Sequence, residues 1–442
     1  MEFSDAAGFW SFQLKLLSLQ RKIQGAIADE KKRVKVARAG AESVKALQQV
    51  RWQARRLGDA FAWLVLKLDR KAIRPLAENS PVPISQEGHG SRGADAVSQY
   101  LASQGWGFPL LHDITDCLRI GDVTFVRPQG DSTSLRTVEL KTRLLGEESS
   151  SSDEGPLLHY SVTVSFLSSP EDALEFEATV PEGQEGQAPE QVVEGPSSPR
   201  QDRRIEKQFK RMSKALTLQE AADSQIFEVD GNSTMSLLVE SSSEGHWGKI
   251  NELIEESRTT GYASVCIDKA FMYVALYSSD GVTEGSVANP RILDDLKATE
   301  FLSEGGKHGN FLEISAIPAQ ETRAAQLYMP FYLYPISQVA ISDFMHGRLV
   351  VVALTNAGRI AEALERDGFD VTIPPGTRSP SDSISVAIPA ERLRFEGLGF
   401  HIRESIHECK GMDFILDVAR GIRGTAQLAG EELSRLQSRT EQ

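Results

Sequence analysis

Cysteine is scarce in this chain of 442 residues: its three cysteines, Cys117, Cys266 and Cys409, lie far apart and form no Cys-x-x-Cys pair. This spacing excludes a disulfide framework and a thiolate zinc knuckle. No uninterrupted apolar run approaches the ~18 residues of a membrane span, and no basic stretch leads into an apolar core at the N-terminus. We therefore expect a soluble protein in a reducing, cytoplasmic setting, with no membrane partner.

Basic residues are missing from one long stretch of the chain. Residues 147–199 contain 12 acidic side chains and no Lys or Arg, a composition that resists packing and predicts an acidic, flexible insertion over residues 146–199. Residues 1–80, in contrast, carry a local charge of +8, although the whole chain has a net charge of −14. The total argues against a nucleic-acid partner, but the basic segments leave local phosphate contacts open.

Helical periodicity dominates residues 9–72, where apolar residues recur along two stripes and basic residues occupy the other face. We interpret residues 1–78 as a basic helical arm. Its charged face is consistent either with an ordinary solvated surface or with a surface that contacts phosphates.

The period changes after a predicted helix at residues 92–104, which ends at Gly105 and Gly107. Three strands are predicted next, with a turn at residues 128–131 between the last two: residues 109–116, 120–127 and 135–142. Within the acidic stretch, residues 159–167 and 174–180 can form a hairpin of their own.

The second half of the chain alternates between helical and extended patterns. We expect amphipathic helices at residues 203–216 and 246–258 and one or two strands at residues 262–277. Residues 301–442 are interpreted as an accessory α+β region. In that region a strand at residues 349–354 precedes a helix, and Thr355 or Asn356 is its expected N-cap.

Chemistry is concentrated in two adjacent predicted strands. Asp122 follows Gly121 at the start of one, and Glu139 and Lys141 lie on the next. Residues two apart on a strand project to the same face, so Glu139 and Lys141 point together, and pairing of the two strands brings Asp122 close to Glu139. Two converging carboxylates favour a hard divalent cation between them.

This Gly-Asp strand followed by Glu-x-Lys, after a helix and a first strand and before a basic helix, resembles the PD-(D/E)xK (restriction-endonuclease-like) nuclease superfamily. The resemblance covers about residues 84–142 and 200–277. It implies an α/β fold, a restriction-endonuclease-like mixed sheet flanked by helices, with a nuclease-like core over residues 79–300. Gly121 stands where the family name has a proline.

The resemblance also implies a function, namely Mg²⁺-dependent hydrolysis of DNA phosphodiester bonds, with Mn²⁺ as a substitute and a role in restriction or phage defence. Asp122 and Glu139 would bind the metal, and Lys141 would orient the attacking water and stabilise charge on phosphorus. Glu87 or Asp95 would add an acidic side chain. The basic helix after the insertion would contact nucleic acid through Arg203, Arg204, Lys207, Gln208, Lys210 and Arg211.

Alternatives remain at this stage. The same fold can serve as a non-catalytic module that binds nucleic acid or protein, and a protein partner or homodimer is left open. Two further Glu-x-Lys sequences, at Glu30–Lys32 and Glu408–Lys410, lack a preceding Asp-led strand. The side chains of His401, Glu404, His407, Glu408 and Cys409 can be drawn as a metal cluster, but a charged surface is the simpler interpretation. The aromatic residues of segment 328–334, together with Trp247, are read as core rather than as base-stacking surfaces.

Overall fold

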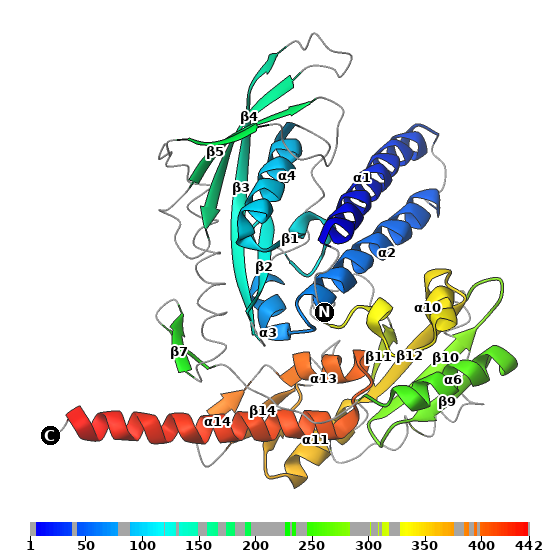
Figure 1. Ribbon diagram of the computed structural model, residues 1–442. Coiled ribbons are helices and arrows are strands. Elements are labelled where there is room, and N and C mark those ends of the chain that lie inside the picture. Colours follow the sequence, from blue (N-terminus) through cyan, green and yellow to red (C-terminus); the bar gives the residue numbers. More distant parts are fainter. Residues whose placement is uncertain are drawn as a thin grey trace. The chain divides into compact units, whose positions relative to one another are not determined.

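The structure is a computed structural model of residues 1–442 that falls into two compact units, residues 1–220 and 221–442 (Figure 1). Each unit is described by itself. The residues that the structure describes are 6–37, 42–77, 89–118, 120–129, 132–148, 157–166, 174–181, 191–195, 226–229, 232–235, 245–282, 301, 308, 312–317, 328–374, 384–388, 393–395 and 398–440.

Two long helices open the first unit and pack side by side (Figure 1). These are α1 (Ala6–Ala37) and α2 (Glu42–Val65), which confirm the predicted helical region. The short helix α3 (Arg70–Ile73) and a 3₁₀ turn (Arg74–Ala77) follow. After a gap, α4 (His89–Leu101) continues into one wide turn (Ala102–Trp106).

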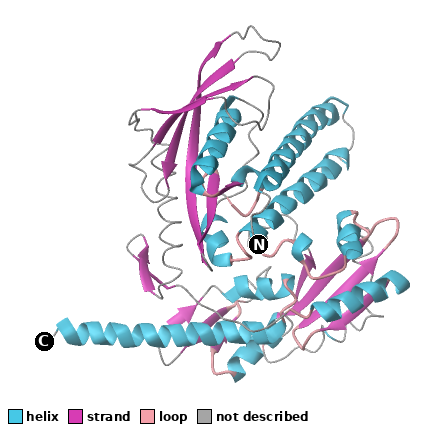
Figure 2. Ribbon diagram, viewed as in Figure 1, coloured by secondary structure: helices cyan, strands magenta, loops and turns pink. Residues whose placement is uncertain are grey.

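A six-stranded antiparallel sheet follows in this unit, with its strands in chain order. Figure 2 shows strands in magenta. The strands are β1 (Phe108–Leu111), β2 (Val123–Gln129), β3 (Ser132–Glu148), β4 (Leu157–Phe166), β5 (Leu174–Pro181) and β6 (Gln191–Gly195). A 3₁₀ turn (His112–Ile114) follows β1. The three predicted strands are therefore present, although the first is shorter than expected.

The acidic stretch contributes strands to this sheet rather than only a flexible insertion. β4 pairs with β3 over almost its whole length, and β5 pairs with β4, as the predicted hairpin required. Val162, Val164 and Phe176 are buried there. The acidic composition of residues 147–199 as a whole hides the apolar residues that alternate with the acidic ones. This alternation is the pattern of a strand, and it determined the local structure.

Helix α4 covers one face of the sheet, because it contacts β3 and Tyr100 lies edge-on to Phe176 on β5. The helix pair α1–α2 contacts β1 and the segment after it. Phe9 and Phe61 both contact the ring of Phe108, and Gln13 bonds to the backbone of Pro109 and Leu111. The basic N-terminal segment is thus packed onto the sheet rather than extended as an arm.

Buried ion pairs on α2 account for part of the basic residues of this segment. Arg55 pairs with Asp116, at 3.0 Å between Nε and Oδ1, and Arg56 pairs with Asp59, also at 3.0 Å. Asp59 in addition accepts hydrogen bonds from the backbone amides of Asp116 and Cys117. Arg55 and Asp59 therefore hold α2 against the segment after β1, and both arginines are engaged in buried ion pairs.

The second unit is built on a four-stranded antiparallel sheet of order β11-β12-β10-β9. Its strands are β9 (Tyr262–Cys266), β10 (Phe271–Tyr277), β11 (Leu312–Ile317) and β12 (Leu349–Asn356). Asn356 accepts a hydrogen bond from the Arg359 amide, which confirms it as the N-cap of the helix after β12.

Helices and two small sheets complete this unit. The helices are α6 (Trp247–Thr260), α10 (Gln338–Met345), α11 (Ala357–Arg366), α13 (Leu398–His407) and α14 (Gly411–Thr440), with a 3₁₀ turn at Phe331–Leu333. The small strands are β7 (Ile226–Val229), β8 (Asn232–Met235), β13 (Asp370–Thr372), β14 (Ser385–Ile388) and β15 (Leu393–Phe395). Tyr328, Phe331 and Tyr334 are buried, as expected of core residues.

The predicted core at residues 79–300 differs from this arrangement. The chain is α/β, but the sheet of the first unit is antiparallel where a mixed sheet was expected. Strands β9 and β10 pair with each other and β10 with β12, in the second unit, so they do not extend the sheet that carries Glu139. Strand periodicity shows that a segment is extended, but the pairing partner depends on contacts distant in sequence.

None of the helices that the structure describes is long and apolar enough to cross a membrane.

We expect Asp59→Ala to lower the free energy of unfolding by about 3 kcal/mol, because it removes a buried carboxylate that pairs with Arg56 and accepts from two backbone amides. Chemical denaturation measures this change. Asp29→Ala is the matched control, since Asp29 pairs with Lys32 on the exposed face of α1, and it should change stability by less than about 0.5 kcal/mol. Equal effects of the two substitutions would contradict the role of Asp59.

Candidate active site

A sharp bend places Asp122 at the start of β2. Gly121 adopts a positive φ of 78°, and a Cβ atom there would lie 2.7 Å from Thr137 Cγ2, so only glycine fits the bend. The backbone of Asp122 is held on both sides: its N–H donates to Val138 O, and its carbonyl accepts from the His112 amide. Asp122 is therefore fixed between β1 and β3.

Glu139 lies near Asp122, and the charge of its carboxylate raises the pKa of Asp122. The β2–β3 ladder ends at Val123 opposite Val138, and at the bend the Asp122 amide also bonds to Val138. In addition, the Leu140 amide donates to Asp122 Oδ2 at 2.7 Å, which holds the carboxylate beside β3. The sequence predicted this juxtaposition.

Lys141 forms an ion pair with Glu139 on the same face of β3. The Glu139 side chain is only 4% exposed, whereas the Lys141 side chain is 49% exposed. A buried carboxylate thus lies beneath an ammonium group that reaches solvent. Val138 and Leu140, which alternate with them, are buried on the other face, as the strand pattern predicted.

The pKa of Asp122 is raised to about 7. Burial is the largest cause and the neighbouring charge of Glu139 the second, and both exceed the lowering by the Leu140 amide and by Lys141. Asp113, an exposed carboxylate in the turn after β1, adds a smaller increase. A proton or another cation shared between two carboxylates that repel each other lowers their electrostatic energy.

A chain of buried hydrogen bonds supports the bend. His112 bonds through Nδ1 to the Gly121 carbonyl and through Nε2 to Thr124 Oγ1, and Thr124 bonds in turn to Thr137. His112 therefore donates from Nδ1, and Thr124 donates to Nε2. The sequence analysis missed His112 and Asp113. Both fell inside the predicted strand 109–116, whereas the structure ends that strand at Leu111 and places them in the turn that follows.

The donor set fits a small divalent cation. Mg²⁺ is commonly held by one or two carboxylates, with water and substrate phosphate completing its coordination. Asp122 and Glu139 supply two such groups. Among the residues that the structure describes, no three His, Cys, Asp or Glu side chains are grouped to hold a metal. Protein ligands alone therefore do not complete a metal site in this part of the chain.

Comparisons with family models, with curated proteins and with solved structures found no match to this chain.

Other predicted site residues lie elsewhere. Asp95 is on α4, which covers the face of the sheet opposite to Glu139, so it is not brought to Asp122. Glu87 and the predicted nucleic-acid contacts fall outside the described residues; the latter are Arg203, Arg204, Lys207, Gln208, Lys210 and Arg211.

The side chains near His401 and Glu408 in the second unit, considered above as a metal cluster, form a buried ion-pair network instead. Lys410 Nζ lies 2.8 Å from Glu404 and 3.1 Å from Glu408, and His401 lies 3.3 Å from Glu404. Burial raises the pKa of the Cys409 thiol, which disfavours a thiolate ligand. The interpretation as a charged surface was also wrong, because Glu404 and Glu408 are almost fully buried.

We expect Asp122→Asn to stabilise the fold at alkaline pH. The folded protein holds the Asp122 proton up to about pH 7, whereas the unfolded chain releases it near its ordinary pKa of about 4. The free energy of unfolding of the natural protein therefore falls as pH rises between these values. Asparagine does not titrate, so the free energy of unfolding of the Asn variant does not fall for this reason. At pH 8 with chelator present, the variant should be more stable by about 1–3 kcal/mol.

The extra stability of Asp122→Asn should disappear below pH 4, where Asp122 of the natural protein is protonated in both the folded and the unfolded state. Denaturation series at the two pH values measure the difference. A variant that is less stable than the natural protein at pH 8 would show that Asp122 is ionised without penalty, and would remove the electrostatic argument for a cation at this site.

Proposed function

We propose that the chain is a metal-dependent nuclease that hydrolyses phosphodiester bonds of DNA, with its active site at Asp122, Glu139 and Lys141. The observation that carries the proposal is the proximity of the two carboxylates beside β3, with an ammonium group paired to one of them. Carboxylates that lay far apart could not share a cation.

Each residue has a role that follows from its surroundings. Asp122 and Glu139 would hold Mg²⁺ or Mn²⁺, a cation that when bound polarises a phosphoryl oxygen and lowers the pKa of water. Glu139 is buried and so is oriented before substrate arrives. Lys141 reaches solvent and can place its ammonium where negative charge develops on the phosphate.

Nucleic acid is the substrate class that this chemistry and the charge pattern support. Several lysines of α1 are exposed, and they can contact phosphates: Lys15, Lys22, Lys31 and Lys35. DNA follows from the resemblance to the PD-(D/E)xK superfamily, as does a role in restriction or phage defence. Both belong to the proposal, and so does the restriction-endonuclease-like fold.

The direct test incubates purified full-length protein with supercoiled plasmid, linear duplex, single-stranded DNA and RNA in millimolar Mg²⁺ or Mn²⁺. We expect cleavage of DNA that chelator abolishes. Asp122→Ala and Glu139→Ala should remove it, and Lys141→Ala should lower the rate by about 10²–10³-fold, the usual effect of removing one charge-stabilising group.

Lys249→Ala is the matched control, because Lys249 is an exposed lysine of α6, an element to which the proposal gives no role. Its rate should equal that of the natural protein. Cleavage that survives both Lys141→Ala and Asp122→Ala would overturn the site assignment. Absence of cleavage on every substrate, with DNA binding retained, would favour the non-catalytic module.

Metal affinity should depend on pH in a defined direction. Asp122, with its pKa near 7, must lose its proton before it binds a cation. Below pH 7 we expect the dissociation constant for Mn²⁺, measured by electron paramagnetic resonance, to rise about tenfold for each pH unit. In Asp122→Asn, affinity should be weak and nearly independent of pH. A pH-independent affinity in the natural protein would contradict Asp122 as a ligand.

A further inference from the structure

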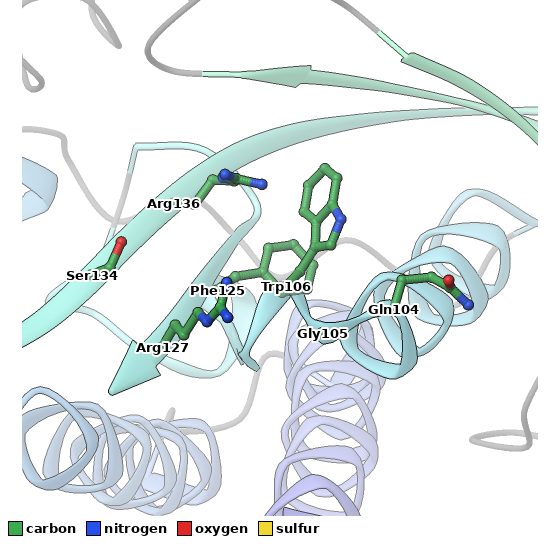
Figure 3. A pocket seen from close by; sticks show the side chains of 7 residues that line it. All are labelled: Gln104, Gly105, Trp106, Phe125, Arg127, Ser134 and Arg136. Carbon is green, nitrogen blue, oxygen red and sulfur yellow. The ribbon is translucent and has the colours of Figure 1, made fainter. Parts of the chain in front are cut away.

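The opposite face of the same sheet carries a pocket of about 290 Å³. It is bounded by the turn after α4 and by strands β2 and β3 (Figure 3). Trp106 and Phe125 form its aromatic wall, and Arg127, Ser134 and Arg136 line the rest of it with polar groups.

The register explains why these side chains meet. Phe125 lies opposite Arg136, and Arg127 lies opposite Ser134, so all four project to one side of the β2–β3 pair. That side is opposite to Glu139, because Arg136 and Glu139 differ by an odd number of positions along β3. The pocket is therefore separate from the proposed active site, and its chemistry does not depend on it.

Two guanidinium groups face this small space without a carboxylate beside them. No Asp or Glu lines the pocket, and within the part of the chain that the structure describes neither Arg127 nor Arg136 makes an ion pair. Both arginines are exposed, so an anion that enters the pocket can reach either guanidinium. Paired arginines offer the planar, bidentate donors that suit a phosphate group, and the Ser134 hydroxyl can add a further donor.

The aromatic wall is held in place by unusual backbone geometry. Trp106 is flanked by Gly105 and Gly107, which both have positive φ, and a Cβ atom on Gly107 would lie 2.7 Å from the Val126 carbonyl oxygen. This close approach seats the turn directly on β2. The indole lies edge-on to Phe125 at 5.4 Å between centroids, and the Arg136 guanidinium lies 4.9 Å from the indole centroid (Figure 3).

Together the indole and the two guanidinium groups are suited to a ligand that joins a planar ring to an anion. The indole and the guanidinium that stacks on it offer surfaces on which a nucleobase packs, and base–aromatic stacking is a common mode of nucleotide binding. A volume of about 290 Å³ is at the small end of ligand sites, which suits one nucleotide rather than a longer strand.

We propose that this pocket binds a single nucleotide, with its phosphate on Arg127 and Arg136 and its base against Trp106. The nucleotide can be free, or it can be the phosphorylated end of a nucleic-acid strand, since both present the same chemistry.

Calorimetric titration of the full-length protein in chelator tests this proposal. The probes are four nucleoside monophosphates, the corresponding nucleosides, inorganic phosphate, phenyl phosphate, and a short single-stranded DNA with and without a 5′-phosphate. We expect monophosphates to bind, and nucleosides and phosphate alone to bind more weakly. Binding of only the 5′-phosphorylated strand would assign the strand end as the source of the nucleotide.

Arg127→Gln and Arg136→Gln should each weaken nucleotide binding about 10- to 100-fold, the usual effect of a lost charge-assisted hydrogen bond. Arg143→Gln is the matched control, because Arg143 is an exposed arginine of the same strand β3 on the other face, and its affinity should be unchanged. Trp106→Leu should weaken nucleotides but leave inorganic phosphate unaffected. Thermal unfolding of each variant establishes that the fold is kept.

The proposal is overturned if no nucleotide or phosphorylated strand binds, or if phenyl phosphate binds while nucleotides do not. Nucleotide binding that is equal in the arginine variants and in Arg143→Gln would also overturn it. Because the variants lie on the face opposite to Glu139, loss of nuclease activity and loss of nucleotide binding are separable outcomes.

Discussion

The bend at Gly121 is the constraint on which the first unit depends. It turns the chain so that the Asp122 backbone bonds to both β1 and β3, and His112, Thr124 and Thr137 support it with a buried chain of hydrogen bonds. The same bend brings the side chain of Asp122 near Glu139. Because these carboxylates repel, the arrangement is unfavourable unless a proton or metal ion neutralises it, and the local structure keeps them together at that cost.

One short antiparallel ladder serves two chemically different faces. On one face lie Glu139 and Lys141, with Asp122 near them, and on the other lie the two arginines beside Trp106. Alternation along β2 and β3 separates these groups although they are neighbours in sequence. Acidic and basic side chains therefore do not neutralise each other across the strand pair, and each face keeps a charge suited to a ligand of opposite sign.

Periodicity predicted most of the individual elements, because helices and strands follow local patterns of apolar residues. The helices α1, α2 and α6 and the strands from β1 to β3, and also β9 and β10, lie close to their expected positions. The pattern of apolar residues did not predict which strands pair with each other. The hairpin within residues 157–181 was predicted as part of an insertion, but its pairing with β3 was not. Residues 262–277 were assigned to the nuclease-like core, whereas β10 pairs with β12 from residues 349–356.

The sequence by itself pointed to the candidate site at Asp122, Glu139 and Lys141, because two consecutive predicted strands carry these residues at or next to their ends and on one face of β3. Only the tertiary structure decided what surrounds them. It buried Glu139 and raised the pKa of Asp122, and it assigned Arg55 and Arg56 to structural ion pairs rather than to phosphate. It also assembled the arginine and tryptophan pocket from a turn and two strands. Burial and charge proximity arise from packing between segments distant in sequence, which no local pattern records.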